Sequence, residues 1–353
     1  MNLAEAVKRI EDLDRGAIEK SKERWLSVAK PLFSLGKFEE LITSIAGIKG
    51  REFYSLDKKA LLIMCADNGV VEEGVTQTRQ EITAVVTGNF AQKVSSVCKM
   101  SEIAGVDIFP VDIGVAVDVD GVTDNNIKVA YGTKNITKEP AMTKDEAIKA
   151  IEVGINKVIE LKELGYDIIA TGEMGIGNTT TSSALASVLL NLPVEDVTGR
   201  GAGLSSKGLQ KKIDTIKRAI NVNKPDKNDV IDVLSKIGGL DIAGITGIFI
   251  GGGVCHIPIV IDGFISGISA VIASKICPKA RQYILPSHVS KEPAGHIVLD
   301  ELGLSPIINA DMCLGEGTGA VALFPLLDMS YAVYSKVNTF QQWNGNETYK
   351  VLR

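Results

Sequence analysis

Short apolar runs separated by longer amphipathic segments are the feature of this sequence that most constrains its fold. From Ala60 onward five such runs have the length of strands, and the segments between them are long enough to hold helices. An alternation of this kind predicts a parallel sheet with helices on both faces. We therefore expect an α/β fold with a doubly wound, mostly parallel, Rossmann-like sheet. The runs are ALLIMCA (60–66), VDIFPVDIGV (106–115), YDIIATGE (166–173), IPIVIDGF (257–264) and QYILPSHV (282–289).

The two ends of the chain have helical rather than strand-like patterns. Apolar residues recur at helical spacing from Leu3 to Leu13, and further helical patterns follow up to about residue 55. After Gly319 the sequence is again compatible with a helix. We therefore expect residues 1–59 and 320–353 to form a small helical domain together, and residues 60–319 to form a large α/β domain.

The composition argues against several classes of partner. A formal net charge of -5 at pH 7 provides no basic field to attract nucleic acid. The five cysteines lie apart from one another without a Cys-x-x-Cys pair, and the histidines lack the spacing of a zinc motif. The charged N-terminus lacks the apolar core of a signal peptide. We expect a reduced, cytoplasmic protein with no metal and no cofactor.

The stretch from Ile242 to Ile261 carries no formally charged side chain and is long enough to span a bilayer. It contains five glycines and a proline, and no second hydrophobic span lies near it. These features favour a buried glycine-rich turn that leads into a strand. We therefore expect no membrane association.

Polar or glycine-rich clusters follow each predicted strand. Ligands of open α/β sheets bind beyond the carboxyl ends of the strands, so clusters at these ends are candidates for a site. An ordinary turn explains any single cluster equally well, because glycine and aspartate are favoured in turns. Five together predict a shared site. They are Asp67-Asn68-Gly69, Asp112-Ile113-Gly114, Gly172-Glu173-Met174-Gly175, Asp262-Gly263 and Pro286-Ser287-His288.

The segment from Gly172 to Thr181 predicts a phosphate site. Its glycines permit close approach of the backbone, and the helix that follows offers free N–H groups and a partial positive charge to an anion. A dinucleotide-binding loop is the alternative, but Thr180 stands where that motif has its third glycine. A nicotinamide-dependent oxidoreductase would also need an acidic residue about twenty positions further on, where Glu195 and Asp196 lie.

Two more glycine clusters carry charged residues. Lys212 follows the cluster from Gly199 to Leu204 and could supply a point charge to a phosphate beside the first loop, although the pattern alone is more typical of a loop and a solvated helix. The cluster from Leu314 to Gly319 places Glu316 between glycines, just before a helix. Partial burial would raise the pKa of that carboxyl toward the range of a general base. A second carboxylate nearby, such as Glu173, would raise the pKa of one of the pair.

Together these motifs resemble the nicotinate-nucleotide–dimethylbenzimidazole phosphoribosyltransferase family, whose members make the α-riboside phosphate of the cobalamin nucleotide loop. The family fold, a parallel α/β domain with a small helical domain from both termini, agrees with the fold expected above, and family members are homodimers. The matching segments, in order and at family-like spacings, are Ala66-Asp67-Asn68-Gly69-Val70, Gly172 to Thr181, Asp241 to Gly247, Asp262-Gly263-Phe264, Pro286-Ser287-His288 and Leu314 to Gly319.

The resemblance implies a metal-free transfer of the phosphoribosyl group of nicotinate mononucleotide to an aromatic base. The family's general base matches Glu316, which would take a proton from the incoming base as nicotinate leaves and the configuration inverts from β to α. Glu173 would be the second functional carboxylate. The residues implied for phosphate and ribose are Gly175, Ile176, Gly177, Asn178, Thr179, Thr180, Gly201, Ala202 and Lys212, and those implied for nicotinate or the acceptor base are Asp67, Thr78, Gln80, Ser290 and Leu314.

The chain departs from the family pattern at three places. Thr78-Arg79 replaces an aromatic–proline pair, Asn68 replaces a histidine and Lys93 replaces a glycine, all expected in or close to the base pocket. Flat apolar surfaces normally hold an aromatic base, so Thr78-Arg79 predicts a more polar or differently shaped pocket. We therefore expect a changed acceptor, namely another benzimidazole, a purine, or a phenol attacked through oxygen. A different interpretation is a paralogue that is catalytic only in a hetero-oligomer with its partner subunit, since fold alone does not guarantee function.

Overall fold

A computed structural model of the protein describes residues 1–344. Its sheet consists of five strands, one in each predicted apolar run, and all neighbouring strands are parallel. The sequence expectation of a parallel α/β fold is confirmed. β1 is buried along its whole length, as expected for a central strand that is covered on both faces. The strands are β1 (Lys59–Ala66), β2 (Val106–Gly114), β3 (Ile168–Met174), β4 (Ile259–Val260) and β5 (Ile284–Leu285).

The strand order is β2-β1-β3-β4-β5, so the direction of winding reverses between β1 and β3. These two strands pair in register from Lys59 with Ile168 to Cys65 with Met174. In doubly wound sheets the crevice beyond such a reversal, at the carboxyl ends of the strands, is where ligands bind. The topology thus directs attention to the residues that end β1 and β3.

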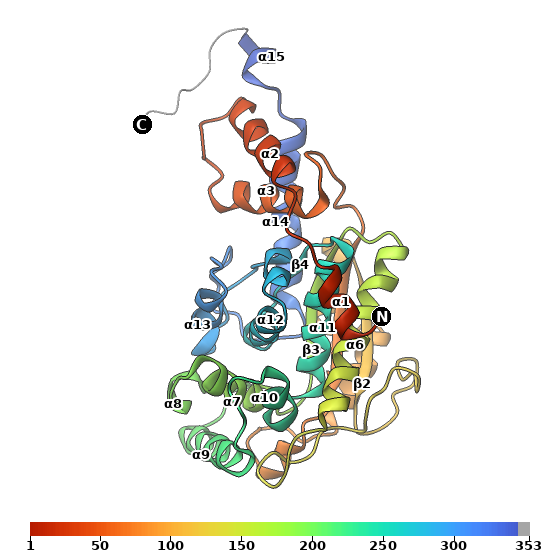
Figure 1. Cartoon of the computed structure of the whole chain (residues 1–353), viewed down its shortest axis with the longest axis vertical. Coiled ribbons are helices and arrows are strands. Elements are labelled where there is room, and N and C mark those ends of the chain that lie inside the picture. The colour runs from red at the N-terminus through yellow and green to blue at the C-terminus, as the bar shows by residue number, and fades with distance from the viewer. Residues whose placement is uncertain (345–353) are drawn as a thin grey trace.

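Helices cover both faces of the sheet (Figure 1). Successive side chains of a strand point to opposite faces. Met64 of β1 lies against Gly244 of α11, whereas Leu61 lies against Gly317 at the start of α14. The helices are α1 (Leu3–Arg9), α2 (Arg15–Ser27), α3 (Lys37–Lys49), α4 (Ile82–Ala91), α5 (Ser96–Ala104), α6 (Lys144–Glu163), α7 (Asn178–Leu190), α8 (Val194–Val197), α9 (Ser206–Asn223), α10 (Val230–Ile237), α11 (Leu240–Cys255), α12 (Phe264–Ile276), α13 (Ala294–Glu301), α14 (Thr318–Lys336) and α15 (Phe340–Asn344), with short 3-10 helices η1 (Gly69–Glu73) and η2 (Pro278–Tyr283).

The glycine-rich stretch from Ile242 to Ile261 is mostly the buried helix α11, not the turn expected from its glycines. The glycines let α11 pack on α6 with almost no space between their backbones. A Cβ added at Gly154 of α6 would lie 2.0 Å from the carbonyl oxygen of Gly244, and one at Gly247 would lie 1.9 Å from that of Ile151. Close packing thus offsets the usual cost of glycine in a helix. Among the described residues, no helix has both the length and the apolar character to cross a membrane.

Segments from both termini form a small helical group at one end of the molecule, where α2 and α3 pack with α14 (Figure 1). The rings of Trp25 in α2 and Tyr334 in α14 lie with their centroids 4.9 Å apart. α1 departs from the expected division at residue 59, because it packs on α6 and α11 of the sheet-bearing part. α14 also crosses the expected boundary at residue 320, since it contacts both α3 and β3.

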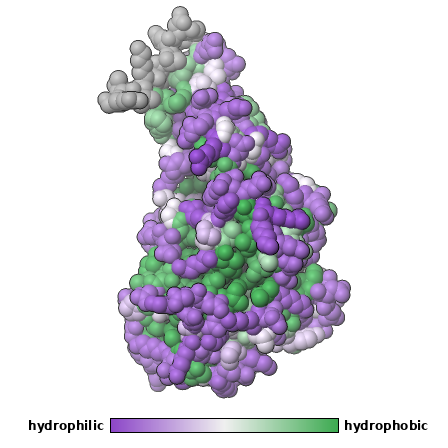
Figure 2. All heavy atoms as spheres, viewed as in Figure 1, coloured by the Kyte–Doolittle hydropathy of each residue, from purple (hydrophilic) through white to green (hydrophobic). Residues whose placement is uncertain are grey.

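Apolar side chains gather over the middle of one face of the molecule, between α8 and α9 at one end and the small helical group at the other (Figures 1 and 2). The fully buried core is continuous from β1 to α11 and α12 and includes Ile248, Phe249 and Ile268. The sheet and α11 therefore form a rigid base for the loops at the carboxyl edge.

We expect Gly154→Ala to destabilise the protein by about 2 kcal/mol or more, because the added methyl group collides with backbone that cannot move aside. Urea unfolding measures this change in the free energy of unfolding. Gly88→Ala is the matched control, since a Cβ there meets nothing nearer than Val119 at 3.7 Å. The control should be neutral or slightly stabilising, by about 0.5–1 kcal/mol. Equal effects of both substitutions would contradict the close packing of α6 on α11.

Candidate active site

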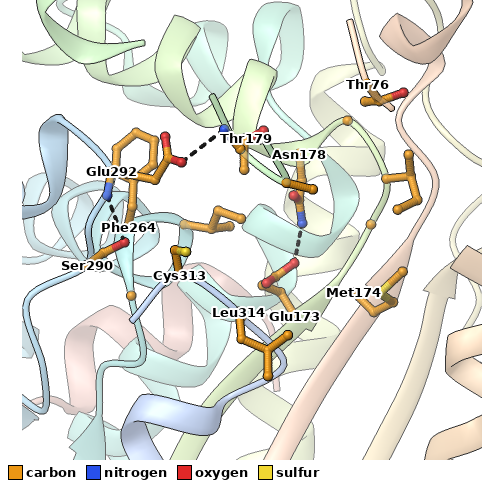
Figure 3. A pocket seen from close by; sticks show the side chains of 18 of the residues that line it. Thr76, Glu173, Met174, Asn178, Thr179, Phe264, Ser290, Glu292, Cys313 and Leu314 are labelled. Carbon is orange, nitrogen blue, oxygen red and sulfur yellow. Dashed lines mark hydrogen bonds between the residues drawn. The ribbon is translucent and has the colours of Figure 1, made fainter. Parts of the chain in front are cut away.

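A cavity of about 270 Å³ lies at the carboxyl edge of the sheet, beyond the ends of β3, β4 and β5 (Figure 3). Its walls come from the loop between β3 and α7, the loop before α9, the segments after β4 and β5, the loop before α14, and residues 75–78 before α4. The fold thus brings together chain segments that lie far apart in the sequence. Within residues 1–344, no group of three histidine, cysteine or acidic side chains is arranged to hold a metal ion.

Most of the residues predicted for the site line this cavity. Both predicted catalytic carboxylates do so, as do residues predicted for the phosphate and for the base. They are Glu173, Gly175, Ile176, Gly177, Asn178, Thr179, Gly201, Ala202, Lys212, Thr78, Ser290, Leu314 and Glu316.

Three predicted residues do not line the cavity. The side chain of Thr180 is fully buried, like most side chains of α7. Asp67 is buried and accepts a hydrogen bond of 2.8 Å from the N–H of Ala116, so it holds the segment after β2. Gln80 precedes α4, where its carbonyl oxygen accepts from the N–H of Thr83. The direct binding roles expected for these three residues stay predictions.

One end of the cavity has the features of an anion site. Gly177, with φ of +96°, precedes α7, and residues 177–179 at the N-terminus of this helix line the cavity. Lys212 of α9 is fully buried, and its Nζ donates to Thr179 Oγ1 at 2.8 Å and to the carbonyl oxygen of Gly199 at 3.2 Å. Burial lowers the pKa of Lys212 to about 8, so most of it remains charged at pH 7. A phosphate group would meet both a helix N-terminus and a buried cation here.

Glu316 stands on a tight loop before α14. Gly315, Glu316 and Gly317 have φ angles of +85°, +62° and +92°, a left-handed run that glycine adopts freely and glutamate does not. The carboxyl group is half-buried, and its Oε2 accepts from the N–H of Val97 at 3.3 Å. Burial raises the pKa of Glu316, with a smaller contribution from the charge of Asp262. The expected combination of partial burial and raised pKa is confirmed.

Asp262, at the end of β4, holds the loop that carries Glu316. Its buried carboxylate accepts from the N–H groups of Gly317 at 3.2 Å, Gly319 at 2.8 Å and Ala320 at 3.2 Å. These N–H groups belong to the start of α14, where a negative charge is favourable. The sequence marked Asp262-Gly263 as a polar cluster without assigning it this function, because its partners lie more than fifty residues further along the chain.

Glu173 is buried where β3 ends, beside Asn178 at the start of α7. Burial raises the pKa of Glu173 to about 8, the Asn178 amide opposes this rise, and the charges of Asp241 and Asp262 add to it. Asn178 Nδ2 donates to Glu173 Oε2, as Figure 3 shows, and to Asp241 Oδ2 at 2.9 Å. The carboxylates that act on Glu173 are therefore Asp241 and Asp262, not Glu316 as the sequence suggested.

Asp241 is the buried acidic residue that sequence reasoning missed. It lies in the first turn of α11 and is fully buried, and burial raises its pKa to about 6. A Cβ added at Gly175 would lie 2.7 Å from its carboxylate, and one at Gly239 would lie 2.4 Å from it. The glycines around Asp241 thus make room for a buried carboxylate, and Asn178 connects it to Glu173.

The three departures from the family pattern have different positions. Thr78 lines the cavity, as expected, whereas Arg79 is exposed and does not line it. Lys93 adopts a φ of +58° and lines a separate cavity beside β2, so its position is one where glycine would be unstrained. Asn68 is buried beneath the β3–α7 loop, where its Oδ1 accepts from Thr181 Oγ1 at 3.3 Å. Of these four residues only Thr78 lines the cavity, and the expected effect of the departures on the acceptor stays a prediction.

Comparisons with known proteins place the chain in a family. A family model described as phosphoribosyltransferase matches residues 10–344. A nicotinate-nucleotide–dimethylbenzimidazole phosphoribosyltransferase of Acetivibrio thermocellus is 48% identical over 96% of this chain and 97% of its own length. One from Clostridium acetobutylicum is 46% identical over the full length of both chains. The crystal structure of the enzyme of that name from Thermus thermophilus superposes with a TM-score of 0.88 at 33% identity and covers 95% of this chain and 100% of its own.

The fold and the site thus define a phosphoribosyltransferase, an enzyme of the pentosyltransferase class. The chain belongs to the nicotinate-nucleotide–dimethylbenzimidazole phosphoribosyltransferase family, and the resemblance recognised in its motifs is confirmed. The comparisons do not favour the alternative of a paralogue that needs a partner subunit for catalysis. They also give no support to a nicotinamide-dependent oxidoreductase.

We expect the free energy of unfolding of Glu173→Gln to rise relative to that of the parent as the pH increases. The carboxyl group has an ordinary pKa of 4.5 when exposed and a pKa of about 8 in the folded state, so between these values the folded state holds a proton that the unfolded state releases. The contribution of this group to stability is full below pH 4.5 and decreases as the pH rises toward 8. Glutamine does not titrate, so relative to the parent the variant should gain up to about 4 kcal/mol between pH 5 and pH 8.5.

Urea unfolding at both pH values tests this expectation. Glu139→Gln is the control, since Glu139 is exposed and its replacement should have the same small effect at both pH values. A difference between Glu173→Gln and the parent that does not change with pH would contradict the raised pKa of Glu173.

Proposed function

We propose that the protein transfers the 5-phosphoribosyl group of nicotinate mononucleotide to a lower-ligand base and produces an α-riboside phosphate and nicotinate in cobamide biosynthesis. The observation that carries this proposal is one cavity in which an anion site faces two carboxyl groups of raised pKa. Lys212 and the start of α7 form the anion site, and Glu173 and Glu316 supply the carboxyl groups. The names of the relatives agree with this chemistry.

In the proposed reaction, a ring nitrogen of the acceptor forms a bond to the anomeric carbon of the ribose. The bond from that carbon to the nicotinate nitrogen breaks, and nicotinate leaves with the electron pair. The acceptor loses a proton to the carboxylate of Glu316. Attack from the face opposite the leaving group inverts the configuration from β to α. Atoms and charges balance without a metal ion or cofactor.

The two glutamates have different roles in this proposal. Glu316 is half-buried, so its carboxyl can reach the acceptor, and its raised pKa makes it a better base than an exposed glutamate. Glu173 is protonated at neutral pH, since burial raises its pKa to about 8. A neutral Glu173 donates a hydrogen bond and does not repel the phosphate held at the neighbouring helix N-terminus.

The acceptor is proposed to lie against residues 75–78, next to Glu316 and Leu314. Val75 and Val86 give this wall an apolar surface, and Thr76, Gln77 and Thr78 add polar groups. A planar base with a polar substituent fits such a surface better than a purely apolar one. We therefore propose an acceptor from the benzimidazoles, purines or phenols, with a phenol attacked through its oxygen.

We also propose a cytoplasmic homodimer. The five cysteines are free thiols, as in a protein of a reducing compartment. Large apolar side chains, among them Met329 and Val85, are exposed in the single chain, and we propose that a second copy covers some of them.

We expect Glu316→Gln to reduce kcat about 100-fold or more, since a general base typically contributes about 10² to 10⁴. The assay follows nicotinate release and the α-riboside phosphate with nicotinate mononucleotide and a panel of benzimidazoles, purines and phenols. Glu163→Gln is the control, because Glu163 is exposed at the end of α6, away from the cavity. Unchanged turnover in Glu316→Gln would exclude Glu316 as the base, and no turnover of the parent with any acceptor would contradict the proposed function.

We expect Lys212→Met to raise the KM for nicotinate mononucleotide at least about tenfold, with a smaller change in kcat. Methionine preserves the buried apolar stem but removes the charge, and a hydrogen bond to a charged group contributes about 1.5–3 kcal/mol. Lys211→Met is the matched control, since Lys211 is the exposed neighbour on the same helix. An equal KM in both variants would show that Lys212 does not bind the phosphate.

A further inference from the structure

Glu292 is a carboxylate of the cavity that neither the motifs nor the proposed reaction accounts for. It lies between β5 and α13 and lines the cavity. Its Oε1 accepts from the N–H of Gly201 at 3.0 Å, and its own N–H donates to Ser290 Oγ at 3.3 Å. Figure 3 shows the Glu292 side chain on the same wall as Ser290 and directed across the cavity toward Thr179.

The position of Glu292 is fixed by the glycine loop that it contacts. A Cβ added at Gly199 would lie 1.8 Å from Glu292 Oε2, so the carboxylate occupies space that only glycine leaves open. The charge of Glu292 also favours the protonated form of Lys212. The carboxylate is therefore held beside the anion site and has lone pairs on Oε1 that the single bond from Gly201 leaves available.

Glu292 lies between the two ends of the proposed donor. Its contact with Gly201 joins it to the proposed phosphate end, where Lys212 lies. Its contact with Ser290 joins it to the proposed nicotinate end. In a nucleotide the ribose connects the phosphate to the base, so the side chain that lies between these ends faces the sugar.

The chemistry of a carboxylate selects the same part of the donor. An ionised carboxylate only accepts hydrogen bonds. It repels the phosphate, and the carboxylate and ring of nicotinate have no N–H or O–H group to donate to it. The two ribose hydroxyls are the only hydrogen-bond donors of the molecule.

We propose that Glu292 binds the ribose hydroxyls of the nucleotide donor and makes the enzyme select ribonucleotides over 2′-deoxyribonucleotides. This inference rests on the proposed transfer reaction and adds to it a binding residue for the sugar.

The test compares two donors, nicotinate mononucleotide and its 2′-deoxyribose counterpart, with the full-length parent and with Glu292→Ala. We expect the parent to prefer the ribonucleotide by about 10- to 100-fold in kcat/KM, the range that one hydrogen bond to a charged group supplies. In Glu292→Ala the two donors should become equal within about threefold, because the 2′-hydroxyl, the one group by which they differ, no longer has a carboxylate to bind. Glu292→Gln keeps one acceptor oxygen but no charge, so its preference for the ribonucleotide should lie between that of the parent and that of Glu292→Ala.

The comparison of the two donors and one control variant separate binding of the sugar from support of the loop. If Glu292 only anchored Gly201, Glu292→Ala would slow both donors equally and the preference would persist, which would overturn the inference. Glu301→Ala, at an exposed position on α13, should leave the preference unchanged.

Failure of this inference can be told from failure of the proposed function. A parent that transfers both sugars equally well, or a preference that survives in Glu292→Ala, overturns the role of Glu292 alone. A parent that releases no nicotinate from either donor with any acceptor overturns the proposed function and this inference with it.

Discussion

The hydrogen bonds of Asp262 to the start of α14 are the interaction on which the arrangement of the site depends. One carboxylate at the end of β4 accepts from three backbone N–H groups of a loop and helix that follow much later in the chain. Those bonds fix the left-handed turn on which Glu316 stands. Residues 317, 319 and 320 are buried, so without the carboxylate of Asp262 their N–H groups would lose their hydration and have no hydrogen-bond partner in its place. Asp262 therefore joins the sheet to the helix that also contributes to the small helical group.

A second buried contact organises the opposite side of the cavity. The Asn178 amide donates to both Glu173 and Asp241, so two acidic groups in the protein interior share one neutral donor. Neutral donation stabilises the carboxylates less than a cation would, so burial dominates and the pKa values of both groups are raised. Charges are thus unevenly distributed in the site. The buried cation Lys212 lies at the end proposed for the phosphate, and the protonated carboxyl lies where a second negative charge would oppose phosphate binding.

Glycine has two separate structural functions in this chain. At Gly154 and Gly247 it lets α6 and α11 approach until their backbones touch, which fixes these two helices against each other. At Gly175, Gly199 and Gly239 it leaves room for the carboxylates of Glu292 and Asp241. The same residue type therefore sets both the helix packing and the positions of the acidic groups, although the sequence shows only clusters of glycine.

The sequence by itself determined the strands and the parallel sheet, and most of the site residues predicted from it line the cavity. Period and length of apolar runs depend on local geometry, and residues at the carboxyl ends of parallel strands necessarily meet at one edge, which is why Glu173 could be predicted. Lys212 and Glu316 could be predicted from the glycine clusters beside them and from the family resemblance. The tertiary structure alone decided which groups contact one another. Asp241 and Glu292 acquire their roles from partners 63 and 91 residues away, and the glycines of α11 form a helix interface only because α6 lies against it. The same holds for Arg79 and Lys93, whose place outside the cavity depends on the path of the chain around α4. Local pattern fixes secondary structure, whereas burial and hydrogen bonding between distant segments fix the chemistry of the site.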